Sequence, residues 1–219
     1  LIKSIPIIWD FQEIHNPESF SRKDLILRKI NTFMCNIHSN KVILGGNHAL
    51  RDYRKIIGSN KTNGIALSQI YKIDLNLKKK KLLFKKFNLP NKKFFIVPNQ
   101  YWAHKNHILI LKSLKFLDKI KKTNFFIVST GNTNNWRDQN YFKYIKNYLN
   151  KNEIKNYFIL GIVSHEDLIN LTYYSEGLIN PSKSEGWSNS VELAKSLNKI
   201  NLISKINCHK EQSNELSYL

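Results

Sequence analysis

Short apolar runs alternate with amphipathic stretches along most of the chain. The runs are rich in β-branched and aromatic residues and are continuous, which is typical of strands buried on both faces. Between them, apolar residues recur at helical spacing, as Ile108, Leu111, Leu114 and Leu117 do. The predicted strands are 5–9, 41–45, 94–97, 125–129, 157–160, 177–180 and 201–204, and the predicted helices are 106–120, 138–150, 165–175 and 189–198.

The order of these elements predicts the fold class. From residue 94 onward, strands and helices alternate, which indicates a parallel sheet with right-handed helical crossovers. We therefore predict an α/β fold with a doubly wound, Rossmann-like sheet. The ligand of such a sheet binds at the carboxyl ends of the strands.

The chain divides into two parts around a lysine-rich stretch. Residues 78–81 are all lysine, and Asn88 to Asn91 read as a turn. We predict a partial N-terminal domain over 1–75, a connector over 76–93 and a C-terminal domain over 94–219. The first part has too few strands for a complete sheet, and we expect the last part to lack its final helices.

Composition adds a strong positive charge. The chain has 35 basic and 16 acidic residues, a formal net charge of +19. One interpretation is an acidic partner, such as nucleic acid or an anionic membrane. The other is the codon bias of an AT-rich genome, because 30 of the basic residues are lysines and the chain also has 28 asparagines and 28 isoleucines. Arginine, the preferred nucleic-acid contact, is scarce, so we expect no nucleic-acid partner.

Several function classes are excluded by what the sequence lacks. Two cysteines, Cys35 and Cys208, do not make a disulfide scaffold or a multi-cysteine zinc site. The longest apolar runs are too short to span a bilayer, and the first residues do not resemble a signal peptide, so we expect a cytoplasmic location. No Gly-x-Gly-x-x-Gly, Walker-type loop or Gly-x-Ser-x-Gly elbow occurs. His104 and His107 have no neighbouring carboxylate, so we expect no metal.

Two loops between a predicted strand and a predicted helix carry the candidate chemistry. In the first, 97–107, Lys105 lies at the expected start of a helix, where it is either solvated or holds a phosphate together with the helix N-terminus. In the second, 181–197, Glu185 is either a favourable charge near a helix N-terminus or an acceptor of hydrogen bonds from sugar hydroxyls. Trp187 is either core or a stacking wall, and Ser188 or Asn189 can cap the next helix.

These loops belong to a longer set of motifs. They include WDFQEIHNPESFS (9–21), KVILGGNHALRDY (41–53), PNQYWAHKNH (98–107), TGNTNNWRD (130–138), the stretch 159–197 and NCHKEQ (207–212). In this order and spacing they resemble the retaining glycosyltransferases of family 4, glycosyl transferase group 1. The resemblance covers most of the chain and implies a GT-B fold.

The resemblance also implies an activity and its partners. It implies transfer of a sugar from a nucleotide-sugar donor to a glycan or lipid-linked acceptor, with retention of configuration and without a cofactor or essential metal. Such enzymes act in cell-surface polysaccharide or lipopolysaccharide biosynthesis, at the inner face of the cell membrane. Peripheral association with anionic lipid would suit the charge of this chain.

Site residues follow from the matched motifs. Lys105 matches the lysine that binds the donor diphosphate, and Glu185 matches the first of two glutamates, which contacts the donor sugar; we expect both to be catalytic. His15 lies in the motif of the acceptor side. The other expected donor-binding residues are Asn99, Gln100, Gly131, Ile162, Val163, Ser184, Gly186, Trp187, Ser188 and Glu192.

Two departures from the family pattern keep an alternative open. The second glutamate of the family falls at Leu193, whereas this chain has Glu192 one residue earlier, about 100° around a helix. Glu192 should therefore point away unless the preceding loop shifts its register. The arginine that usually precedes the lysine is also absent, with Asn99 and Gln100 nearby. The alternative is a degenerate fragment that binds nucleotide weakly or not at all.

Overall fold

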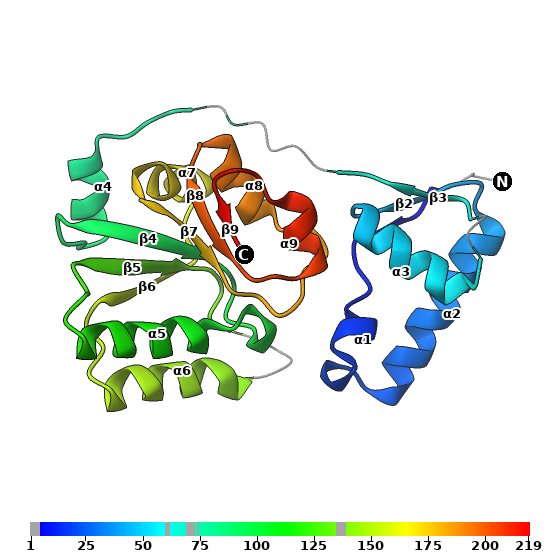
Figure 1. Ribbon diagram of the computed structural model, residues 1–219, viewed down its shortest axis with the longest axis horizontal. Helices are drawn as coiled ribbons and strands as arrows, with labels where there is room; N and C mark the ends of the chain where they lie inside the picture. The colour runs from blue at the N-terminus through cyan, green and yellow to red at the C-terminus, as the bar shows by residue number, and fades with distance from the viewer. Residues whose placement is uncertain (1–4, 60–61, 69–72, 74, 135–138) are drawn as a thin grey trace. The chain divides into compact units, whose positions relative to one another are not determined.

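The computed structural model describes residues 5–59, 62–68, 73, 75–134 and 139–219. The chain forms two compact units (Figure 1). We call them the N-terminal unit, residues 1–70, 184–189 and 205–212, and the C-terminal unit, residues 71–183, 190–204 and 213–219. Part of the motif at 130–138 and the predicted start of the helix at 138 lie outside the described residues.

The N-terminal unit contains a parallel sheet of order β1-β2-β3. The core of the unit surrounds β2, whose Val42 and Leu44 pack with Phe11 and Tyr53. The strands are β1 (Ile7–Ile8), β2 (Val42–Leu44) and β3 (Gly64–Ala66), and the helices are α1 (Gln12–His15), η1 (Pro17–Ser19), α2 (Arg22–His38), α3 (Asn47–Ile57) and α9 (Asn207–Gln212).

The C-terminal unit is built on a parallel sheet of order β6-β5-β4-β7-β8-β9, the doubly wound arrangement. The strands are β4 (Lys93–Pro98), β5 (Phe125–Thr130), β6 (Tyr157–Gly161), β7 (Gly177–Asn180), β8 (Ile200–Ile203) and β9 (Ser217–Tyr218). The helices are α4 (Lys80–Lys86), α5 (His107–Lys119), α6 (Gln139–Lys151), α7 (His165–Tyr174) and α8 (Asn189–Ser196).

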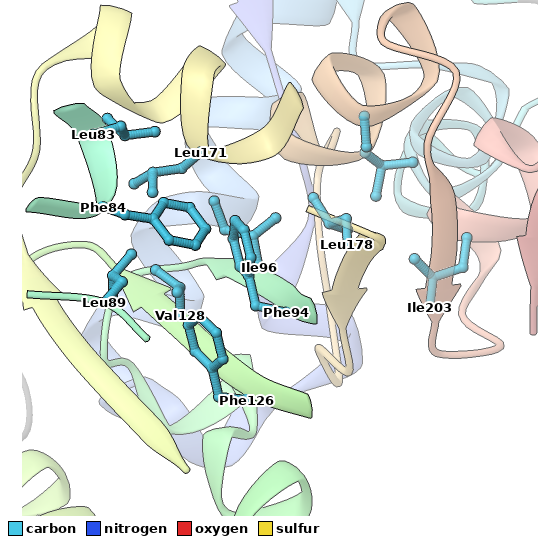
Figure 2. Close-up of a cluster of buried hydrophobic side chains, with 12 residues drawn as sticks. Leu83, Phe84, Leu89, Phe94, Ile96, Phe126, Val128, Leu171, Leu178 and Ile203 are labelled. Atoms are coloured by element: carbon cyan, nitrogen blue, oxygen red, sulfur yellow. The ribbon is translucent and has the colours of Figure 1, made fainter. Parts of the chain in front are cut away.

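Alternate residues of the strands belong to two separate hydrophobic cores, one on each face of the sheet. Phe94, Ile96 and Phe126 point to one face, where α4, α7 and α8 cover them (Figure 2). Val97 and Ile127 point to the other face, where α5 and α6 pack against them. Figure 1 shows these two groups of helices on opposite sides of the sheet. The continuous apolar runs of the sequence therefore reflect burial on both faces.

The predicted α/β fold with its parallel sheets is confirmed, and each predicted strand and helix has a counterpart. The sequence pattern left α1, α2, α3 and α4 without predicted bounds and missed β3, β9 and α9. These last three elements are two to six residues long and carry few apolar residues. The stretch predicted to connect the domains, 76–93, contains α4. Its Leu83 and Phe84 are buried in the C-terminal core, so this part of the stretch packs with the second unit.

A buried carboxylate joins α4 to α7. Asp167 is 1% exposed and receives hydrogen bonds from Lys86 Nζ at 2.5 Å, Ser164 Oγ at 2.7 Å and Lys78 Nζ at 3.1 Å. Burial alone would raise the pKa of Asp167, but these three bonds outweigh it and lower the pKa to about 2. Because the folded pKa lies below the unfolded value, Asp167 stabilises the fold above pH 4, and this contribution fades as the pH falls toward 2.

We predict that Asp167→Asn lowers the free energy of unfolding at pH 7 by about 2 kcal/mol, since charge-assisted hydrogen bonds are lost. Urea unfolding of both proteins between pH 7 and pH 3 should show the difference shrinking as the pH falls. A difference that is the same at both ends of this range would contradict the role of the ionised carboxylate.

Candidate functional site

The candidate site lies where the winding of the C-terminal sheet reverses. β4 pairs with β5 on one side and with β7 on the other. The chain therefore leaves the carboxyl ends of β4 and β7 toward opposite faces of the sheet, and ligands of doubly wound folds bind at this point. The loops that follow β4 and β7 are the two that the sequence singled out.

The first loop, 98–106, runs from β4 to α5. Asn99 is 4% exposed, and its Nδ2 donates to Asn180 Oδ1 at 3.1 Å. Lys105 is half-buried at the end of a short 3₁₀ helix, η2 (Ala103–Lys105). Asn106 follows in the left-handed conformation, with φ 58°, and α5 begins at His107. Lys105 thus precedes the N-terminus of α5, close to the position that the sequence predicted.

Three hydrogen bonds join this loop to the end of β7 and the loop after it. Besides the Asn99–Asn180 bond, the backbone N–H of Lys183 donates to the carbonyl of His104 at 2.7 Å. Asn106 Nδ2 donates to the carbonyl of Pro181 at 3.2 Å. Asn180 Oδ1 also accepts from Ser182 Oγ at 2.6 Å. The two loops are therefore held together by their own polar groups.

The loop after β5 packs against the first loop through Gly131. Its φ is +125°, and a Cβ at this position would lie 2.6 Å from the carbonyl oxygen of Asn99. The N–H of Gly131 donates to the carbonyl of Gly161 at 2.7 Å, and the N–H of Tyr101 donates to the carbonyl of Asn132 at 3.0 Å. Only glycine permits this approach, so Gly131 shapes the Asn99–Gln100 backbone.

Ile162 and Val163 follow β6 and precede α7. Ile162 is 76% exposed. Ser164 caps α7, because its Oγ accepts the N–H of Asp167. The cap and the strand thus hold this short turn from both sides.

The other predicted donor residues, Ser184 to Ser188, belong to the N-terminal unit. Gly186 is packed so tightly that a Cβ would lie 2.8 Å from Cβ of Asp10. The ring of Trp187 stacks on His48, with centroids 6.4 Å apart and planes 15° apart. Glu185 between these anchored neighbours is half-buried.

Backbone and side-chain hydrogen bonds fix both ends of this segment. Ser184 Oγ accepts a hydrogen bond from Asn16 Nδ2. The side chain of Gln212 accepts from the N–H of Ser188 at 3.1 Å and donates to its carbonyl at 3.0 Å. Ser188 directly precedes α8, which begins at Asn189.

On α8, Leu193 stands where the family has its second glutamate, and Glu192 stands one residue earlier. Both residues are buried. Leu193 is 1% exposed and Glu192 is 6% exposed. The carboxylate of Glu192 pairs with Lys195 Nζ at 3.1 Å on the same helix. The position that the resemblance gives to a second glutamate is therefore filled by an apolar side chain.

His15, the candidate of the acceptor side, lies at the end of α1. Its Nε2 is 2.6 Å from Oδ2 of Asp52, which is 4% exposed. A buried carboxylate in this position orients the imidazole, as in other His–Asp pairs. Sequence reasoning missed Asp52, which lies 37 positions away from His15. It also missed Asn180, although an amide side chain at the end of an apolar strand could have pointed to it.

Within the described ranges, no three His, Cys, Asp or Glu side chains gather into a group that could hold a metal ion. Likewise, in the part of the chain that the structure describes, none of the helices has the length and apolar character needed to cross a membrane.

Comparisons with known proteins agree with this architecture. The family model for glycosyl transferases group 1 matches residues 79–215. No curated protein matches the chain. The crystal structure of HepE from Anabaena in complex with UDP and glucose is similar, with a TM-score of 0.79 and 14% identity over 95% of this chain and 55% of that one.

Two further structures share the fold. The sucrose-phosphate synthase of Thermosynechococcus elongatus has a TM-score of 0.70 and 12% identity, over 88% of this chain and 48% of that one. WaaG, a glycosyltransferase involved in lipopolysaccharide biosynthesis, has a TM-score of 0.60 and 12% identity, over 76% of this chain and 44% of that one. This chain spans about half the length of these proteins.

The chain belongs to the glycosyl transferases group 1 family, whose model covers more than half of it. Its α/β architecture, with parallel sheets in both units, is that of the GT-B fold.

We predict that Gly131→Ala lowers the free energy of unfolding by about 3 kcal/mol, because a Cβ there combines backbone strain with a clash against Asn99. The matched control is Gly161→Ala. Gly161 also has a positive φ, +69°, but a Cβ there meets nothing within 4 Å. This control should cost only about 1 kcal/mol, the strain alone. Equal losses in urea unfolding would show that the close approach to Asn99 does not matter.

Proposed function

We propose that this chain carries the donor-binding part of a retaining glycosyltransferase of family 4. The proposed reaction transfers a sugar from a nucleotide-sugar donor to a glycan or lipid-linked acceptor, in cell-surface polysaccharide or lipopolysaccharide biosynthesis. The observation that carries the proposal is the joined pair of loops at the reversal point of the sheet, within the region that the family model matches. The complexes of HepE with UDP and with UDP-glucose support a nucleotide sugar as donor.

Lys105 is the proposed diphosphate ligand. It precedes the N-terminus of α5, a helix of 13 residues whose dipole favours an anion at this end. The lysine and the first-turn N–H groups would stabilise the negative charge that develops on the leaving diphosphate. Neutral Asn99 and Gln100 replace the usual arginine and would contribute hydrogen bonds without charge. We expect no metal or cofactor in this step.

The remaining roles follow from the same proposal. Glu185 would accept hydrogen bonds from the donor sugar, and Gly186 would allow the backbone to approach it. The exposed Ile162 and the neighbouring Val163 would hold the base, largely through the main chain. His15, oriented by Asp52, would serve the acceptor. Peripheral binding to an anionic membrane would bring the +19 chain to a lipid-linked acceptor.

A second candidate function rests on one observation. Leu193 is buried at the position of the second glutamate, so the site would lack a charged hydrogen bond to the donor. A non-catalytic chain that binds nucleotide weakly or not at all would result. Thermal unfolding with UDP-, GDP- and ADP-glucose distinguishes the candidates, because a ligand bound only to the native state raises its stability. A shift with one nucleotide identifies the base, and a cooperative transition without any shift favours the second candidate.

We predict that Lys105→Ala weakens binding of the nucleotide sugar about 10- to 100-fold, the loss of one charged hydrogen bond. The control is Lys112→Ala, which removes the same charge from an exposed position on α5. Titration calorimetry on the three proteins measures the effect. If Lys105→Ala binds like the control, Lys105 does not contact the diphosphate.

For Glu185→Gln we predict a selective effect. Binding of the nucleotide sugar should weaken about tenfold, through the loss of a charged acceptor, whereas binding of the nucleoside diphosphate alone should not change. The ratio of the two dissociation constants is the measurement. An equal loss for both ligands would place Glu185 against the nucleotide instead of the sugar.

A further inference from the structure

A buried histidine beside the first loop makes hydrogen bonds through both nitrogens of its ring. His107, the first residue of α5, is fully buried, and its ring stacks on Tyr101 with centroids 4.1 Å apart and planes 9° apart. Its Nε2 lies 3.1 Å from the carbonyl oxygen of Gln100, and its Nδ1 lies 2.9 Å from the hydroxyl of Tyr157. All four residues belong to the C-terminal unit.

These contacts define where the proton of the imidazole lies. A carbonyl oxygen only accepts hydrogen bonds, so Nε2 carries the hydrogen and donates it to Gln100. Nδ1 therefore accepts from the hydroxyl of Tyr157. Burial lowers the pKa of His107 to about 4, and the nearby charge of Lys105 acts in the same direction. The ring is thus neutral at pH 7, in a single tautomer.

The hydrogen bond from His107 to Gln100 constrains the first loop. The loop leaves β4 at Asn99 and returns to α5 at His107, so the His107–Gln100 bond closes its two ends. Inside this closure, the N–H of Tyr101 donates to Asn132 and its hydroxyl donates to Ser129 Oγ at 2.8 Å. Lys105 lies on the closed segment, two residues before His107.

We propose that His107 is a positioning residue: through its bond to the Gln100 carbonyl, it fixes the loop that presents Lys105 to the donor diphosphate. This inference rests on the proposed function. A phenylalanine keeps an aromatic ring that can stack on Tyr101, but it can neither donate to Gln100 nor accept from Tyr157. The variant His107→Phe therefore tests the hydrogen bonds of the ring while it keeps the aromatic packing.

The first measurement uses UDP as the probe, in titration calorimetry at a temperature where all variants are folded. We expect His107→Phe to weaken UDP binding about tenfold, since one hydrogen bond that orders the loop is lost. Leu83→Ala is the control for lowered stability. Leu83 is buried in the core on α4 and has no proposed role in the site, so its loss should destabilise the fold and leave UDP binding unchanged. Equal UDP binding by His107→Phe and wild type would overturn the proposal.

A double-mutant cycle adds a readout that a purely structural role would not change. If His107 acts by positioning Lys105, the effect of His107→Phe should fall below threefold when Lys105 is already alanine. A full tenfold effect in the Lys105→Ala background would show that His107 acts by another route and would overturn the proposal.

Hydrogen exchange separates failure of this inference from failure of the proposed function. In His107→Phe, the amide of Tyr101 should exchange at least tenfold faster, while the amides of β5 keep their wild-type rates. An unchanged exchange rate at the Tyr101 amide would overturn the positioning role, whether or not a nucleotide binds. If the wild type binds no UDP, GDP or ADP, the proposed function fails and the diphosphate role of His107 fails with it; faster exchange would then support only the ordering of the loop.

Discussion

The pairing of β4 with both β5 and β7 is the constraint on which the site depends. Right-handed crossovers place α5 and α6 on one face of the sheet, and α7 and α8 on the other. The chain therefore leaves β4 and β7 toward opposite faces of the sheet. The polar groups of the loops after these strands bond to one another, through Asn99 and Asn180 and through the N–H of Lys183. The structural requirement for satisfied polar groups thus fixes the two loops of the candidate site relative to each other.

The sheet below this edge is held by aromatic packing. Phe94, Phe126 and Phe158 lie on three neighbouring strands, with centroids 5.3 and 5.2 Å apart, and Phe84 of α4 packs edge-on against Phe94. Such pairs add stability beyond the burial of their area, and their geometry fixes how strands and helix pack. The rigid core holds the ends of β4 and β7, and with them Asn99 and Asn180, within hydrogen-bond distance. A site built on such loops is organised before its ligand arrives.

The large positive charge is distributed unequally between the core and the surface. In two of the ion pairs, the carboxylate is buried and the lysine is exposed: the side chain of Asp167 is 2% exposed, against 53% for Lys86, and that of Asp52 is 6% exposed, against 73% for Lys55. Lysine stems extend along the surface and keep their ammonium groups in water. The two buried carboxylates therefore stabilise packing, while the excess of lysine gives the molecule a field that attracts anionic partners.

The sequence by itself determined the class of the fold and the location of the candidate loops. Continuous apolar runs and helical stripes depend on local periodicity, which the chain carries without any tertiary contact. The motifs around Lys105 and Glu185 also predicted membership of glycosyl transferases group 1, which the family model confirms. The roles of these residues stay predictions.

Only the tertiary structure decided which residues support the site. Asn180, Asp52 and Tyr157 are 81, 37 and 50 positions away from Asn99, His15 and His107, their respective partners, and no periodicity connects such distant positions. The short elements β3, β9 and α9 likewise depend on neighbours for their hydrogen bonds, since so few residues cannot form a stable helix or strand alone. Local pattern thus determines where strands and helices form, and long-range hydrogen bonds decide how the loops between them are held.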